Sequence, residues 1–146
     1  MVAEEKKPMS AFEKITFLKG SPFFHELPLE QLVHIASYMK EEVHKPGTVV
    51  IQENTTGDKM YVAVSGELEV TIAGGPPVAT LTKMQFFGEQ ALIDQEQRSA
   101  SVTTRDDVHL LSLGRDDFHN ILRRYSSIAL GMLQVLSLRL REAQKS

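Results

Sequence analysis

The chain has 146 residues, of which 42% are hydrophobic, which is enough for one well-packed core and favours a single domain over two. It contains no cysteine, so disulfides, thiolate metal sites and a cysteine nucleophile are excluded. Lysine and arginine number 16 against 19 acidic residues, and because the net charge of −3 provides no overall basic field, we expect this chain itself to make no nucleic acid contact.

The first part of the chain predicts a polar tail followed by helices. Residues 1–9 are charged where a signal peptide would be apolar, and no stretch is apolar enough to cross a bilayer. We therefore expect a disordered tail over residues 1–9 and a cytoplasmic protein with no membrane segment. Helices are expected within residues 10–40, because Ser10 can cap a first helix, Gly20 can end it, and Pro28 suits the first turn of a second.

From residue 41 to residue 113 the pattern changes to short β-rich runs separated by turn residues. Residues 67–72 alternate polar and apolar side chains, as expected of a strand with one solvent-exposed face. Pro46-Gly47 predicts a turn, and residues 74–77 predict a connection. Many short strands joined by tight turns indicate an antiparallel double-stranded β-helix, or jelly-roll barrel. The predicted fold class is therefore mainly β, with helices at the N- and C-termini.

The C-terminal segment, residues 116–143, returns to a helical pattern. Asp116 or Asp117 can begin one helix, and a second is expected from about Ser127 to Glu142. The apolar stripe of this second helix is wider than one flat packing face requires, and it comprises Ile128, Met132, Leu133, Val135, Leu136 and Leu140. Burial within one domain explains such a stripe. The alternative is that the helix also covers a ligand or forms a homodimer with a second copy.

Residues 86–102 combine groups that suit a phosphorylated sugar. Gly88 lets backbone N–H groups approach an anion, and the short helix expected after it adds partial positive charge. Arg98 offers a fixed fork of charged donors, whereas the Glu89 carboxylate only accepts hydrogen bonds and repels phosphate. Glu89 and Arg98 therefore suit opposite ends of one ligand, the first its hydroxyls and the second its phosphate.

The order of these parts resembles the cyclic nucleotide-binding domain family, which includes regulatory regions of protein kinases A and G, nucleotide-gated channels and catabolite activator proteins. The resemblance covers nearly the whole chain, and it depends on the order of several short motifs. These motifs are Ser21-Pro22-Phe23-Phe24 with Leu27-Pro28, Pro46-Gly47, Gly57-Asp58 with Met60-Tyr61, Ser65-Gly66-Glu67, the phosphate-binding cassette of residues 86–102, and Leu113-Gly114-Arg115-Asp116-Asp117-Phe118. The resemblance implies that residues 10–146 form one such domain.

The resemblance also implies a role for each matching cassette residue. Glu89 would accept a hydrogen bond from the ribose 2′-hydroxyl, assisted by the Gly88 backbone, and Arg98 would pair with the cyclic phosphate. The Ser99 hydroxyl would add a further donor. Backbone N–H groups would complete the anion site at Gln90, Ala91 and Ser99.

The identity of the base follows less directly from the sequence. In this family a serine after the cassette arginine can contact guanine, but activator-type members that share Arg98-Ser99-Ala100 bind cAMP, so Ser99 does not decide the base. We expect cAMP rather than cGMP as the ligand. The last helix would cover the base and signal to an unidentified effector by closing. The residues expected to cover the base are Leu136, Arg139 and Leu140.

Catalytic and metal sites are not indicated, so we expect no enzyme, no cofactor and no bound metal. A jelly-roll metalloenzyme needs several histidines and a carboxylate at strand spacing. The five histidines of this chain do not form such a set; they are His25, His34, His44, His109 and His119. The sequence also lacks the glycine-flanked serine of hydrolases and the phosphate loop of nucleoside triphosphatases.

Four alternatives remain open at the sequence level. Glu89 and Arg98 could form an ion pair that holds the cassette shut, or Asp94 and Glu96 could compete for Arg98 and weaken the site. The chain could also be a degenerate member that serves protein interaction alone. Finally, it could be the sensor part of an activator-type transcription regulator, and thus a piece of a longer protein.

Overall fold

The computed structural model describes residues 8–21 and 24–145, apart from the side chain of Val135. Most of the predicted tail, as well as Pro22 and Phe23, therefore lies outside the described residues. The last residue of that predicted tail makes a defined contact, because the N–H group of Met9 donates a hydrogen bond to Glu41 Oε2 at 2.8 Å.

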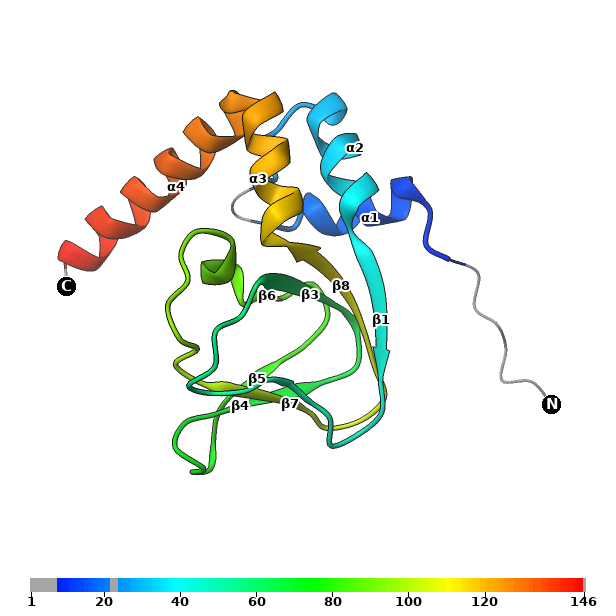
Figure 1. The fold of residues 1–146 in the computed structure, drawn as a ribbon, viewed down its shortest axis with the longest axis vertical. Helices are drawn as coiled ribbons and strands as arrows, with labels where there is room; N and C mark the ends of the chain where they lie inside the picture. Colours follow the sequence, from blue (N-terminus) through cyan, green and yellow to red (C-terminus); the bar gives the residue numbers. More distant parts are fainter. Residues whose placement is uncertain (1–7, 22–23, 146) are drawn as a thin grey trace.

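The described chain consists of two four-stranded sheets with helices at both ends (Figure 1). The helices are α1 (Ala11–Leu18), α2 (Leu29–Tyr38), the 3₁₀ helix η1 (Glu89–Leu92), α3 (Arg115–Arg124) and α4 (Ser126–Gln144). The strands are β1 (Lys40–His44), β2 (Val49–Ile51), β3 (Lys59–Ser65), β4 (Leu68–Thr71), β5 (Pro77–Leu81), β6 (Phe86–Phe87), β7 (Ser101–Thr104) and β8 (Val108–Gly114).

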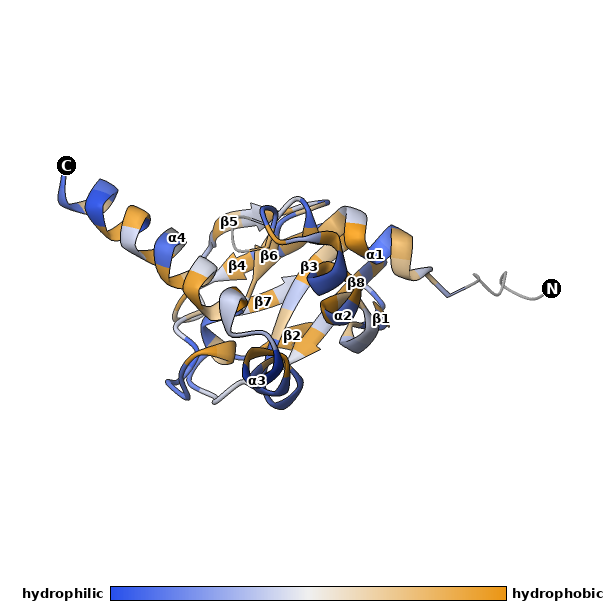
Figure 2. Ribbon diagram, turned by 90° about the horizontal axis from the view of Figure 1, so that it is seen from above, coloured by the Kyte–Doolittle hydropathy of each residue, from blue (hydrophilic) through white to orange (hydrophobic). Residues whose placement is uncertain are grey.

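The two sheets have the strand orders β1-β8-β3-β6 and β2-β7-β4-β5, and all of their strand pairs are antiparallel. In Figure 1 the helices α1, α2 and α3 gather over the first sheet, on the side away from the second. Figure 2 shows the same arrangement from above. The predicted fold class, a mainly β jelly-roll-like barrel flanked by helices, is confirmed.

Strand β3 separates two apolar cores because it is buried on both faces. Met60 and Val62 pack in the cluster that includes the helices, whereas Tyr61 and Ala63 pack in the cluster inside the barrel. This division follows from strand geometry, since successive side chains point to opposite faces. It also explains the continuous apolar run in the sequence, which a strand with one wet face would not have.

The ends of the helices follow local capping chemistry. Ser10 caps α1 as predicted, and it forms a reciprocal pair of hydrogen bonds with Glu13. The predicted start of α3 was one or two residues late, because the helix begins at Arg115, after the Gly114 cap, rather than at Asp116 or Asp117. The two aspartates lie in the first turn instead, where acidic side chains interact favourably with the positive end of the helix.

Helix α4 buries only part of its apolar surface. Ile128 and Met132 are buried against the rest of the structure. The outward leucines are 37–62% exposed, namely Leu130, Leu133, Leu136, Leu138 and Leu140. Figures 1 and 2 both show the C-terminal half of α4 projecting away from the barrel. Among the helices of the described chain, none has the length and apolarity to cross a membrane.

Candidate functional site

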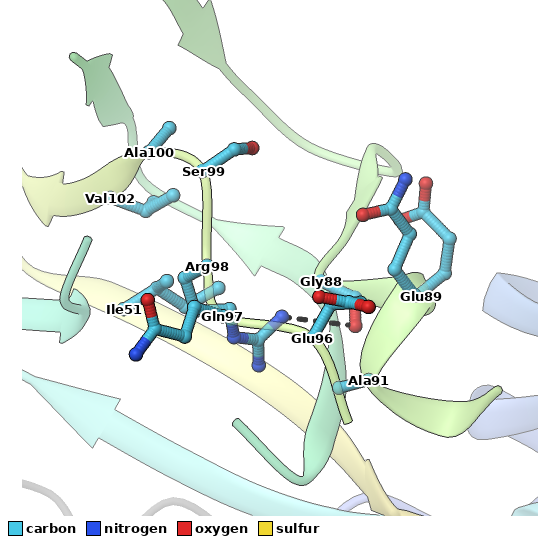
Figure 3. Close-up of a pocket in the computed structure, with 11 residues that line it drawn as sticks. Ile51, Gly88, Glu89, Ala91, Glu96, Gln97, Arg98, Ser99, Ala100 and Val102 are labelled. Carbon is cyan, nitrogen blue, oxygen red and sulfur yellow. Dashed lines mark hydrogen bonds between the residues drawn. The ribbon is translucent and has the colours of Figure 1, made fainter. Parts of the chain in front are cut away.

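A cavity of about 240 Å³ lies between η1, the loop that follows it and the first residues of β7 (Figure 3). The structure brings seven of the residues predicted from the sequence to this cavity: Gly88, Glu89, Gln90, Ala91, Arg98, Ser99 and Ala100. Four further residues complete its lining: Ile51, Glu96, Gln97 and Val102. The cavity is therefore polar where the cassette lines it and apolar where the barrel strands reach it.

Gly88 lets the chain turn from strand β6 into η1. Its φ of +76° lies in the left-handed region, which glycine adopts without the strain of a Cβ atom. The chain turns there into the 3₁₀ helix that starts at Glu89. The Ala91 N–H group, which the family resemblance implies as a phosphate donor, donates instead to the Gly88 carbonyl at 3.1 Å. To contact an anion as well, the Ala91 N–H group would have to divide its hydrogen bond between the Gly88 carbonyl and the anion.

Arg98 is held in place by the backbone on both sides. Its own N–H group donates to the Thr55 carbonyl at 2.7 Å, and its carbonyl accepts from the Asn54 N–H group at 2.8 Å. The guanidinium donates from Nη2 to the Lys59 carbonyl at 2.9 Å and from Nη1 to the Gly88 carbonyl at 3.3 Å. Two of its five N–H donors are thus used to fix its orientation, and the other three form no hydrogen bond within the described chain.

Two glycines flank the Arg98 guanidinium closely. A Cβ atom on Gly57 would overlap the Nε, Cζ and Nη2 atoms of Arg98, and one on Gly88 would lie 3.0 Å from Nη1. The φ of Gly57 is not in the left-handed region, so the demand for glycine there comes from the close approach of the guanidinium alone. Gly57 is therefore part of the site although its own atoms do not line the cavity.

Arg98 stays charged although it is partly buried. Partial burial lowers the pKa of Arg98 from its ordinary value, while Asp58 and Glu89 act in the opposite direction. An arginine nevertheless stays protonated near neutral pH. Tyr61 stacks on Phe87 with ring centroids 5.2 Å apart, and burial raises the pKa of Tyr61 to about 12, so its hydroxyl is neutral there.

The acids near Arg98 leave it unpaired. Over residues 8–21 and 24–145, no carboxylate forms an ion pair with Arg98, whether from Glu89, Asp94 or Glu96. The structure therefore shows neither the Glu89–Arg98 ion pair nor direct competition by the loop acids. The Arg98 guanidinium therefore contacts two backbone carbonyls but no carboxylate, and Arg98 lines the cavity.

Two side chains of helix α3 form hydrogen bonds with the C-terminal end of η1. Arg115 donates from Nε to the Ala91 carbonyl at 2.6 Å and from Nη2 to the Gly57 carbonyl at 2.7 Å. One turn later on α3, His119 Nε2 lies 3.0 Å from the Leu92 carbonyl, where its N–H tautomer donates. Arg115 and His119 thus connect the cassette to the C-terminal helices.

The residues expected to cover the base lie elsewhere. Leu136, Arg139 and Leu140 are exposed on α4, and none of them lines the cavity. Their part of α4 projects away from the barrel (Figure 1). The structure does not bring these three residues together with the cassette.

Several residues of the site were not predicted from the sequence. Ile51 could have been found as an inward-facing residue of β2, and Val102 as the last residue of the cassette. Gly57 and Arg115 belong to motifs of the family resemblance, but their contacts join segments far apart in the chain, which spacing alone does not reveal. No cluster of three or more His, Cys, Asp or Glu side chains able to hold a metal ion occurs among the residues that the structure describes.

Comparison with a known family agrees with this geometry. A family model described as "Cyclic nucleotide-binding domain" matches residues 41–125, which is more than half of the chain. The chain belongs to the cyclic nucleotide-binding domain family. The matched residues include all of β1 except Lys40, strands β2 to β8, the whole cassette and helix α3.

Individual relatives are similar over most of this domain. The cyclic AMP receptor protein of Thermus thermophilus is 34% identical over 130 residues, which cover 86% of this chain and 60% of the receptor. The crystal structure of the N-terminal domain of a transcriptional regulator from Streptomyces coelicolor A3(2) matches with a TM-score of 0.81 and 28% identity, covering 88% of this chain and 93% of that one.

A third relative was crystallised with its ligand. The regulatory domain of Toxoplasma gondii PKA, solved with cAMP, matches with a TM-score of 0.72 and 31% identity, covering 80% of this chain and 46% of that one. The chain thus spans 60% of the Thermus receptor and less than half of the Toxoplasma chain. The shared part is the cyclic nucleotide-binding regulatory domain.

Proposed function

We propose that this chain is a sensor that binds cAMP in preference to cGMP at the cassette cavity. The observation that carries the proposal is the placement of Glu89 and Arg98 on one cavity without an ion pair between them. An ion pair would satisfy both side chains internally, whereas separate side chains are both available to a ligand. A cyclic ribonucleotide has a phosphate for Arg98 and a hydroxyl for Glu89.

The choice of cAMP has two supports. Arg98 is followed by Ser99 and Ala100, the combination that resembles cAMP-binding activators, and both residues line the cavity. The Thermus relative is a cyclic AMP receptor protein, and the Toxoplasma regulatory domain was crystallised with cAMP. The similarity to that receptor and to a transcriptional regulator further favours gene regulation as the setting of this sensor.

The proposed contact between Glu89 and the ribose can be tested with cAMP and 2′-deoxy-cAMP. Because a hydrogen bond to a charged group contributes about 1.5–3 kcal/mol, Glu89→Gln should weaken cAMP binding by about tenfold or more. The same substitution should change 2′-deoxy-cAMP binding much less, since that ligand lacks the hydroxyl. Isothermal titration calorimetry of all four combinations measures this difference.

A matched control for this cycle is Glu30→Gln, which removes the same charge from the exposed first turn of α2. It should leave both affinities unchanged. Equal losses for cAMP and 2′-deoxy-cAMP in Glu89→Gln would contradict the ribose contact and leave Glu89 only a general electrostatic role.

We further infer that α4 moves when the nucleotide binds. Its N-terminal turns are fixed by buried Ile128 and by a hydrogen bond of 2.7 Å from Gln31 Nε2 to Ser127 Oγ, whereas its outer leucines are exposed. A helix fixed at one end and exposed along the other can close over the cavity and bury Leu136 and Leu140. The movement would change the contact of α4 with an effector, or with a second copy in a homodimer.

Hydrogen exchange tests this closure. In saturating cAMP the amides of residues 133–144 should exchange at least about tenfold more slowly, because a ligand that binds the closed state better shifts the population toward it. The amides of α1 serve as the internal control and should not change. If the exchange of α4 is the same with and without cAMP, closure is excluded. If α4 is protected equally in both and the mass in solution is that of a dimer, its exposed face belongs to the homodimer.

A further inference from the structure

The charges that line the cassette cavity do not favour an anion. The lining contains two acidic residues, Glu89 and Glu96, and one basic residue, Arg98, which gives a formal charge of −1. The proposed ribose contact requires Glu89 but gives no role to Glu96. A second carboxylate on a cavity for a phosphate needs its own explanation, because it opposes the ligand charge that Arg98 attracts.

The side chain of Glu96 faces the cavity and is not neutralised. Figure 3 shows its carboxylate between Arg98 and Glu89 in the view into the cavity. In the part of the chain that the structure describes, no basic side chain forms an ion pair with Glu96. Its charge therefore opposes an anion in the cavity, and solvent screens part of this repulsion because Glu96 is exposed.

The backbone around Glu96 fixes this position. The Glu96 N–H group donates to Asp94 Oδ1 at 3.2 Å, and the next residue, Gln97, forms a β-bridge with Thr56. Arg98 is then anchored by its own backbone hydrogen bonds. These interactions hold the loop so that Glu96 lines the same cavity as Arg98.

We propose that Glu96 limits the affinity of the site and selects ligands by the charge of their phosphate, an inference that rests on the proposed cyclic nucleotide binding. A cyclic phosphodiester carries one negative charge, whereas the phosphomonoester of 5′-AMP, with its second pKa of about 6, carries close to two at pH 8. The repulsion from Glu96 scales with that charge. Glu96 thus penalises noncyclic nucleotides more than cyclic ones.

The test compares wild type with Glu96→Gln for cAMP by calorimetry and for 5′-AMP by competition against cAMP, both at pH 8. Removing one like charge from the lining of the cavity should tighten cAMP binding by about three- to tenfold, and the gain for 5′-AMP should be larger. Raising the salt from about 0.1 M to about 1 M should shrink the gain, because the screening length falls from about 10 Å to about 3 Å.

Asp94→Asn is the matched control. Asp94 carries the same charge in the same loop but does not line the cavity, and asparagine retains the Oδ1 atom that accepts from the Glu96 N–H group. This variant should bind cAMP like wild type. An equal gain in both variants would show a general effect of loop charge and overturn the proposal.

The remaining outcomes separate this inference from the proposed function. If wild type binds cAMP and Glu96→Gln binds it no more tightly, only the role of Glu96 is wrong. Weaker binding by Glu96→Gln would make Glu96 a ligand contact, which also overturns the proposal. Equal gains for cAMP and 5′-AMP, or no competition by 5′-AMP against either protein, overturn selection by charge. If neither protein binds either nucleotide, the proposed function itself fails.

Discussion

Replacing Arg98 with alanine should abolish most of the nucleotide affinity. The guanidinium is the charged donor that faces the cavity, and each hydrogen bond to a charged group is worth about 1.5–3 kcal/mol, so we expect a loss of at least about tenfold and up to about a hundredfold. Calorimetric titration with cAMP measures the loss. Arg123→Ala is the control, since Arg123 bonds within its own exposed helix turn and should leave binding unchanged.

Gly57→Ala tests the same prediction without removing the charge. The new Cβ atom would overlap the guanidinium, so Arg98 must move although it remains in the protein. We expect a loss of affinity that approaches that of Arg98→Ala. Wild-type affinity in Arg98→Ala would contradict the phosphate assignment, whereas wild-type affinity in Gly57→Ala alone would show that the position of Arg98 tolerates displacement.

Phe118→Ala should have the largest effect on stability. The side chain is 1% exposed, and its ring meets Phe24 edge to face with centroids 6.3 Å apart, beneath the helices that cover the barrel. Truncating a buried phenylalanine costs about 3–5 kcal/mol, because transfer energy is lost and a cavity remains. Thermal unfolding should show a decrease in Tm of about 10 °C or more.

Phe12→Ala is the control for that substitution. Phe12 is 78% exposed on α1, so the same change in side-chain volume should alter the free energy of unfolding by no more than about 0.5 kcal/mol. Similar shifts in Tm for the two variants would mean that Phe118 is not part of a packed core.

The sequence predicted those features that depend on local chemistry. The cap of α1 follows from Ser10 and Glu13 alone, and the turn into η1 follows from the glycine at position 88. Strand β3 was recognisable from its composition, although burial on both faces hides the usual alternation. The start of α3 was misplaced, because Asp116 and Asp117 suit both a cap and a first turn.

Features that depend on contacts between distant segments could not be predicted in the same way. The approach of Gly57 to Arg98 joins residues on different loops, and the hydrogen bonds of Arg115 depend on where α3 docks. The position of α4 could not be predicted from the sequence either, since its leucines are compatible with burial, with a ligand or with a second copy. The roles of Leu136, Arg139 and Leu140 stay predictions.

The most direct test of the central claim is calorimetric titration of the folded, nucleotide-free protein with cAMP and then with cGMP. At about −0.3 kcal/mol per heavy atom, a nucleotide of this size should bind with a Kd in roughly the micromolar range, and cAMP should bind more tightly than cGMP. Absence of measurable binding for both nucleotides would contradict the account and favour a family member that has kept the fold for protein interaction alone.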